Sequence, residues 1–161
     1  MALLDVNALI ALACDSHVHH ARMRSWFAES VAAGWATCPM TESGFVRVSS
    51  NPGVLPVAVG LDAARAVLVM LRALEGHRFL TDDVSLADSD VPAINGHRQV
   101  SDAHLLTLAR RRGVRLVTFD RGVLALAQGR DVELLERYGS SISRGAGGGL
   151  LGRWAAEDQA G

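Results

Sequence analysis

The sequence predicts an α/β fold in three layers, with a parallel sheet between two layers of helices. Short apolar runs alternate along the chain with longer segments whose apolar residues recur at helical spacing. Strands that are separated by helices pair in parallel and are covered by helices on both faces. The length of 161 residues, 49% of them apolar, and the net charge of −1 are typical of one soluble globular domain.

The chain begins with a predicted strand and helix. Residues 2–4 are a short apolar run, which is the pattern of a buried strand. Asp5 or Asn7 can begin the helix that follows over 8–14, because both side chains can accept a hydrogen bond from a free backbone N–H. The sequence therefore places a carboxyl group directly after the first strand.

A second helix, strand and third helix follow. Asp15 or Ser16 can cap the second helix, which continues at helical spacing until Gly34 ends it. Residues 35–38 are again short and apolar, which predicts a buried strand. The next helix spans 41–50 and stops at an Asn-Pro-Gly turn.

The middle of the chain contains two further helices. Apolar residues form one face of a helix over 61–74, and a short strand follows over 77–80. Residues 81–99 are irregular, with several acidic residues and room for one short helix. Ser101 is predicted to cap the next helix, 102–112, which ends at a glycine.

The last predicted elements are a strand over 114–118, a short helix over 121–128 and a final strand over 132–135. The alternating pattern stops soon afterwards. We therefore expect one domain over 1–138 and a flexible tail rich in glycine and serine over 139–161.

All sixteen positively charged side chains are arginine, and lysine is absent. This composition excludes a lysine-containing phosphate-binding loop and a Schiff-base lysine. Arginine remains protonated and binds phosphate through paired hydrogen bonds. Because the net charge is close to zero, any binding of nucleic acid would depend on a local patch.

Two features predict a cytoplasmic protein. Cys14 and Cys38 have neither a metal-binding spacing nor the number expected of a disulfide scaffold. No apolar stretch reaches the roughly 20 residues that a membrane span needs.

Four acidic residues are expected near the carboxyl ends of the strands, where ligands bind in open parallel sheets. They are Asp5, Glu42, Asp102 and Asp120, and Thr118 can add a hydroxyl group. Each acid alone has a structural explanation, as a turn residue or in the first turn of a helix. Together they would repel one another unless a cation lay among them. Oxygen ligands favour Mg²⁺ or Mn²⁺, and such a site suits phosphodiester hydrolysis.

Four segments around these acids carry a family resemblance. They are LLDVNALIAL at 3–12, TESGFVRVSSNP at 41–52, GHRQVSDAHLLTLA at 96–109 and LVTFDRGV at 116–123. In this order they resemble the PIN-domain nucleases, and within them the VapC toxins of bacterial VapBC toxin–antitoxin pairs. The resemblance implies a PIN-like α/β/α fold.

The resemblance also implies a mechanism and partners. Asp5, Glu42, Asp102 and Asp120 would be the catalytic, metal-binding acids of a ribonuclease dependent on Mg²⁺ or Mn²⁺. The substrate would be RNA, with tRNA or rRNA as examples in the family. The protein would form a homodimer and be neutralised by a VapB-like antitoxin.

Other polar residues have supporting interpretations. Asn7 would help to start a helix or support the acids, and Arg47, Arg98 and Arg121 are candidate RNA contacts because each lies in a segment that carries an acid. The arginines at 110–112 fit either RNA contact or the last turn of a helix. We expect the histidines at 17, 19 and 20 to lie at a solvated helix start, and those at 97 and 104 to pack or form hydrogen bonds.

Two other functions remain open. A catalytically silent PIN-fold module could act through RNA or antitoxin binding, although all four acids are present. A metal-dependent phosphatase or receiver-like domain is disfavoured by the missing lysine.

Overall fold

The computed structural model describes residues 1–55 and 58–136. The predicted tail over 139–161 lies outside the described residues, and so do the last two residues of the predicted 1–138 domain. No helix in the described part of the chain is long and apolar enough to cross a membrane.

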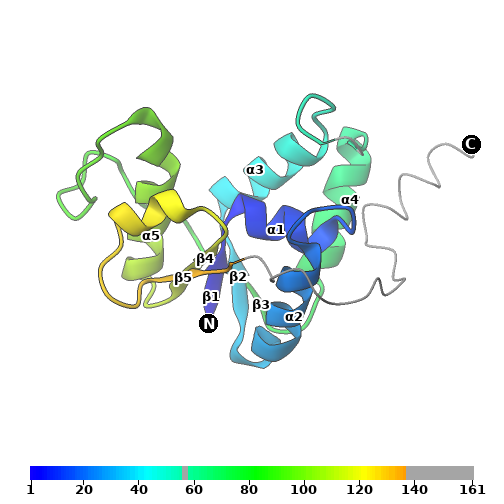
Figure 1. The fold of residues 1–161 in the computed structure, drawn as a ribbon, viewed down its shortest axis with the longest axis horizontal. Coiled ribbons are helices and arrows are strands. Elements are labelled where there is room, and N and C mark those ends of the chain that lie inside the picture. Colours follow the sequence, from blue (N-terminus) through cyan, green and yellow to red (C-terminus); the bar gives the residue numbers. More distant parts are fainter. Residues whose placement is uncertain (56–57, 137–161) are drawn as a thin grey trace, which may run out of the picture.

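A parallel sheet of five strands lies at the centre of the described residues, as predicted (Figure 1). The strands are β1 (Ala2–Leu4), β2 (Trp35–Thr37), β3 (His77–Phe79), β4 (Arg115–Thr118) and β5 (Val132–Leu134). Their order is β3-β2-β1-β4-β5 and every neighbouring pair is parallel. The first strand is thus the middle strand, and its carboxyl end lies between those of β2 and β4.

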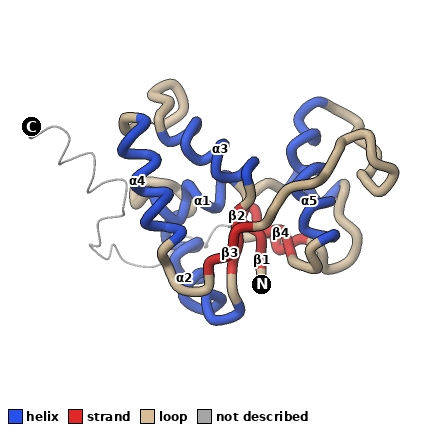
Figure 2. Tube along the Cα trace, turned by 180° about the vertical axis from the view of Figure 1, so that it is seen from behind, coloured by secondary structure: helices blue, strands red, loops and turns tan. Residues whose placement is uncertain are grey.

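Helices cover both faces of this sheet, which confirms the three-layer α/β/α prediction (Figure 2). They are α1 (Val6–Ala13), α2 (His20–Ser30), α3 (Pro39–Ser49), α4 (Leu61–Arg72) and α5 (Val100–Arg111). The first four lie on one face, and α5 lies on the other. Successive side chains of β1 point to opposite faces of the sheet. Leu4 therefore packs with α1 to α4, and Leu3 packs with α5.

The predicted start of the second helix was wrong. Helix α2 begins at His20 and not at Asp15 or Ser16. Its first residues are preceded by turns, in which the His17 N–H bonds to the Cys14 carbonyl. The Ser16 hydroxyl lies 3.2 Å from the Cys14 thiol, so it is used next to the end of α1 instead of capping α2.

Two other helix predictions also need correction. Ser101 does not cap α5, because a short 3₁₀ helix at His97–Gln99 leads directly into it and places Ser101 in its first turn. The segment predicted as a helix over 121–128 is a 3₁₀ helix at Arg121–Ala125, which Asp120 caps through the N–H of Gly122.

The contact between α1 and α3 depends on one glycine. A Cβ atom at Gly44 would lie 2.4 Å from Cγ2 of Val6, closer than two carbon atoms can approach. Gly44→Ala should therefore lower the free energy of unfolding by about 1–3 kcal/mol, as overpacked cores do. Urea unfolding would measure this change. Gly96→Ala is the matched control because open space surrounds that position; an equal effect of both changes would contradict the prediction.

Candidate active site at the carboxyl edge of the sheet

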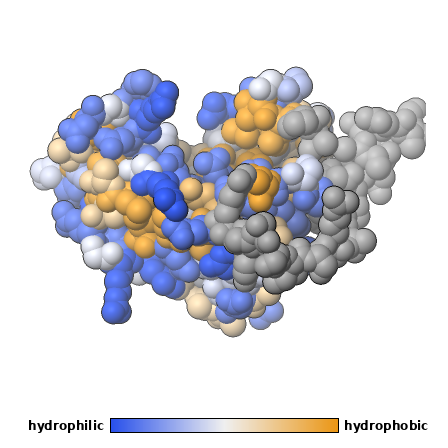
Figure 3. Space-filling view, viewed as in Figure 1, coloured by the Kyte–Doolittle hydropathy of each residue, from blue (hydrophilic) through white to orange (hydrophobic). Residues whose placement is uncertain are grey.

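The register of the sheet brings Asp5 and Thr118 together. Leu4 of β1 pairs with Val117 of β4, so the next residues, Asp5 and Thr118, lie at the same level of the edge. The Asp5 N–H donates to the Val117 carbonyl at 3.1 Å, which continues the hydrogen bonding between β1 and β4 by one residue. Figure 3 shows the surface hollowed between the part of the molecule that contains α5 and the part that contains α3 and α4, on the side to which these strand ends point.

The Asp5 carboxylate is buried and both of its oxygens are used. One accepts a hydrogen bond of 2.7 Å from the N–H of Ala8, so Asp5 is the N-cap of α1. The other accepts from the Thr118 hydroxyl. Burial raises the pKa of Asp5 to about 6; the two hydrogen bonds oppose this rise, and the charges of Asp102 and Asp120 add to it. The fold thus holds this carboxyl group where ionisation is costly.

Asp102 and Asp120 are the two neighbours of Asp5 that the sequence also singled out. Asp102 lies in the first turn of α5, and its pKa is raised by partial burial and by the charge of Asp120. Asp120 follows β4 and is exposed; its N–H bonds to the Thr118 hydroxyl oxygen at 3.0 Å. Three of the four predicted acids therefore lie within electrostatic reach of one another.

Glu42, the fourth predicted acid, is held by other partners on the β2 and β3 side of this edge. It lies in the first turn of α3, and its Oε1 accepts a 2.6 Å bond from the hydroxyl of Thr37, the last residue of β2. Its Oε2 lies 3.3 Å from Arg72 at the end of α4. The same Thr37 oxygen is 2.9 Å from Nε2 of His77, whose pKa is lowered by burial and by Arg72.

Sequence reasoning missed these partners of Glu42. Thr37 carried a signal, because it ends a buried strand five residues before the acid. Arg72 carried none, since it lies thirty residues away in the chain and its helix gives no indication of which strand end it reaches.

The chemistry of the acids fits a hard cation, although the side chains are not gathered into a compact cage. Within 1–55 and 58–136, no group of three or more His, Cys, Asp and Glu side chains is arranged to hold a metal ion. However, Asp5, Asp102 and Asp120 offer only oxygen ligands, which suit Mg²⁺ or Mn²⁺. A divalent cation would also relieve the like-charge repulsion that contributes to the raised pKa of Asp5.

The supporting residues predicted from the sequence have varied surroundings. Asn7 is exposed in the first turn of α1, where Asp5 is the cap. Arg47 is exposed on α3 and lines an open groove between α3 and α4 that also includes Glu42. Arg98 is exposed before α5. Arg121 is exposed as well, and it forms a 2.8 Å ion pair with Glu136.

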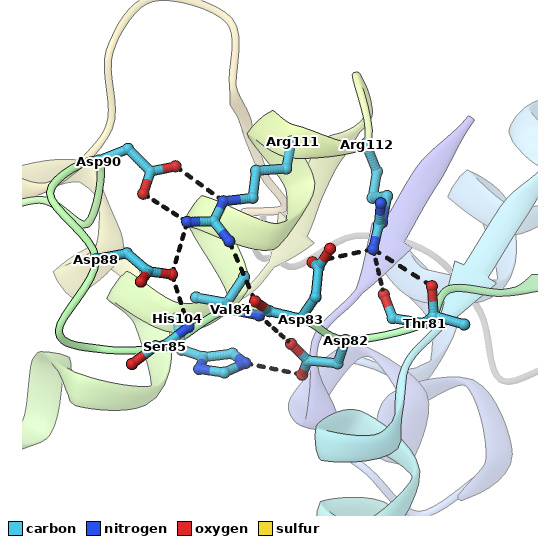
Figure 4. A network of polar contacts seen from close by, with 10 residues as sticks. All are labelled: Thr81, Asp82, Asp83, Val84, Ser85, Asp88, Asp90, His104, Arg111 and Arg112. Carbon is cyan, nitrogen blue, oxygen red and sulfur yellow. Dashed lines mark hydrogen bonds and ion pairs between the residues drawn. The ribbon is translucent and has the colours of Figure 1, made fainter.

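The arginines at 110–112 bind loops of the protein itself. Arg111 bonds to the carboxylates of Asp88 and Asp90 at 2.8 and 2.6 Å, and Arg112 reaches Asp83 at 3.0 Å (Figure 4). Arg110 pairs with Asp131 at 2.8 Å. These contacts fasten the irregular segment after β3, and the loop before β5, to the end of α5.

Two histidine predictions have different outcomes. His104 forms a hydrogen bond of 2.8 Å with Asp82, in line with the hydrogen-bonding role expected of it (Figure 4). The helix start expected at 17, 19 and 20 is confirmed in position, since His19 is the N-cap of α2 and His20 its first residue, but the three side chains are half-buried and not solvated. The ring of His19 stacks on Phe119 with centroids 4.2 Å apart, and Nδ1 of His20 lies 2.8 Å from the Ala11 carbonyl oxygen.

The fold and the acids at its edge define a class of protein. A parallel sheet covered by helices on both faces is the fold that the PIN-domain resemblance implied, and three of the four acids expected with it lie within electrostatic reach of one another. Residues 2–129 match the PIN domain, and the chain belongs to that family.

Within the family, the chain is a VapC-type protein. It is 72% identical over 138 residues to "Ribonuclease VapC38" of Mycobacterium tuberculosis (strain ATCC 25618 / H37Rv), covering 84% of this chain and 98% of that protein. It is also 47% identical over 137 residues to "Ribonuclease VapC39" of the same strain, covering 83% and 99%. "Ribonuclease VapC44" of that strain is 41% identical over 132 residues, covering 78% and 90%.

Proposed function

We propose that this VapC-type chain is an endoribonuclease toxin that hydrolyses RNA phosphodiester bonds with Mg²⁺ or Mn²⁺. The observation that carries the proposal is the buried Asp5 carboxyl group, whose pKa is raised to about 6 and which has Asp102 and Asp120 as charged neighbours. The names of the relatives, which are ribonucleases, support the choice of RNA as the substrate.

Each residue has a distinct part in this proposal. Asp5, Asp102, Asp120 and Glu42 would hold the cation, which when bound supplies an activated water and stabilises charge on the phosphoryl group. Thr118 and the N–H of Ala8 fix both oxygens of Asp5, so its carboxylate plane is set before anything binds.

The phosphate contacts are proposed for three arginines. Arg47, Arg98 and Arg121 are exposed in segments that carry the acids, and a guanidinium group can bind a phosphate with paired hydrogen bonds. The Glu136 carboxylate competes for Arg121 in this structure. Asn7 would act only as a supporting side chain.

The proposed partners follow from the VapC resemblance. They are an RNA substrate such as tRNA or rRNA, a VapB-like antitoxin that neutralises the activity, and a second copy of the chain in a homodimer. A cytoplasmic location stays a prediction from the sequence. So does the flexible tail over 139–161.

Incubation of the purified full chain with RNA tests the proposed activity. We expect cleavage with Mg²⁺ or Mn²⁺, none in excess EDTA, and recovery when Mg²⁺ is restored. Because water is the attacking group, the new ends should carry no 2′,3′-cyclic phosphate, which separates this activity from a contaminating metal-independent ribonuclease. Equal cleavage in EDTA would contradict the metal mechanism. RNA binding without cleavage would favour the silent module, and turnover of small phosphoesters alone would favour a phosphatase.

A further inference from the structure

Glu42 is held by contacts that none of the other three acids shares. Its two oxygens are occupied by Thr37 and Arg72, at 2.6 and 3.3 Å. Asp5 has other partners, the N–H of Ala8 and the Thr118 hydroxyl. In the described residues, no three His, Cys, Asp or Glu side chains are arranged to hold a metal ion.

We propose that Arg72 and Thr37 form a latch that keeps Glu42 away from the other three acids until a divalent cation displaces the arginine. The inference rests on the proposed metal-dependent function. It adds that Arg72 and the cation compete for the same carboxylate, so that Arg72 lowers the affinity of the site for metal. Arg72 is a positioning residue, because it acts through Glu42.

The position of Arg72 suits this role. It is the last residue of α4, and its guanidinium carbon lies 5.0 Å from the centre of the Phe79 ring, close enough for a cation–π contact. Phe79 pairs with Thr37 in the sheet, so ring and hydroxyl group lie at the same level of the edge. The arginine is therefore directed to Glu42 from the side opposite to Asp5.

The strength of the contact suits a latch that opens. The Arg72 side chain is 45% exposed, and ion pairs exposed to this degree contribute little to stability. Glu42 is 14% exposed, so once Arg72 leaves, its carboxylate lies in a partly desolvated place that favours a cation as replacement. Thr37, fixed in β2, stays in place while Arg72 exchanges.

Manganese binding to the full chain tests the latch without reference to activity. Electron paramagnetic resonance of free Mn²⁺ gives the affinity, and we expect Arg72→Ala to bind Mn²⁺ about threefold more tightly than the unmodified chain. Arg65→Ala is the matched control: it removes the same charge from the same helix, and Arg65 lines the groove that contains Glu42 but pairs with Asp62. It should leave the affinity unchanged.

Two further variants make the result specific. Arg72→Met removes the charge while keeping an apolar side chain over Phe79, and it replaces the alanine variant if that one does not fold. In a Glu42→Gln background, Arg72→Ala should no longer tighten binding, because the carboxylate for which it competes is gone.

Each outcome of the titration has a meaning. Tighter binding only when Glu42 is present supports the latch. Affinity equal to that of Arg65→Ala, or weaker than that of the unmodified chain, overturns it and leaves the metal-dependent function standing. If the unmodified chain binds no Mn²⁺, the proposed function fails and the latch fails with it. A purely structural role of Arg72 would lower the melting temperature without tightening metal binding.

Discussion

Asp5→Asn is expected to reduce RNA cleavage by at least about 10–100-fold while the chain remains folded. Asparagine can still accept the hydrogen bond from the N–H of Ala8, so the cap of α1 is kept. The change removes the charge at the most buried acid of the candidate site. Loss of a metal ligand should cost at least as much as loss of a residue that supports one, which is about 10–100-fold.

The control is Asp62→Asn, which removes an aspartate charge from the exposed start of α4. Its cleavage rate should equal that of the unmodified chain in the same Mg²⁺ buffer, and circular dichroism would show that both variants are folded. Full activity of the Asp5 variant would rule out the proposed catalytic role of this carboxyl group.

The same residue should make the metal-free protein less stable as the pH rises. Burial raises the pKa of Asp5 from 3.8 to about 6, so between these values the folded state binds more protons than the unfolded state. The stability that the protonated group contributes is therefore complete below pH 4 and is lost as the pH rises to about 6. A shift of about two units corresponds to a loss on the order of 3 kcal/mol. Asp102, whose pKa is also raised, acts in the same direction.

Urea unfolding in EDTA measures this effect as a difference between two proteins. The free energy of unfolding of Asp5→Asn, minus that of the unmodified chain, should increase between pH 4 and pH 6 and then level off. Other titrating groups are common to both chains and cancel. Adding Mg²⁺ at pH 7 should stabilise the unmodified chain more than the variant. A constant difference across this pH range would show that Asp5 ionises normally.

The sheet could be predicted from the sequence because its signals are local. Short apolar runs bounded by glycine, proline or acidic residues marked β1, β2 and β4, whereas β3 is the mainly polar, partly exposed His77–Phe79 and gave a weaker signal. The requirement for parallel pairing gave the layers. Errors arose where a side chain had a competing partner. Ser16 met the Cys14 thiol instead of capping α2, and Ser101 was bypassed when a 3₁₀ turn continued into α5.

Part of the candidate site could also be predicted because its signals are local in the sequence. Asp5 follows β1, Thr118 is the last residue of β4 and Asp120 comes two residues later; because β1 and β4 are neighbours in the sheet, their convergence required only the strand order. The surroundings of Glu42 depend on Arg72, which approaches from a helix that comes later in the chain. No local pattern indicates such a pairing. The contacts of the arginines at 110–112 with the 81–90 segment were hidden in the same way.

The bond between Thr118 and Asp5 has a consequence for biosynthesis. It joins positions 113 residues apart, and β4 lies directly beside the first strand. Protein synthesis proceeds from the N-terminus, so the ribosome must release most of the domain before the hydroxyl group can reach the carboxylate. Until then β1 also lacks a neighbour on that side. Non-local pairing of this kind is slow, because the long loop between the strands must close before their contacts form. Strand order therefore delays the assembly of the acids, and an unfinished chain would carry them as separate, harmless side chains.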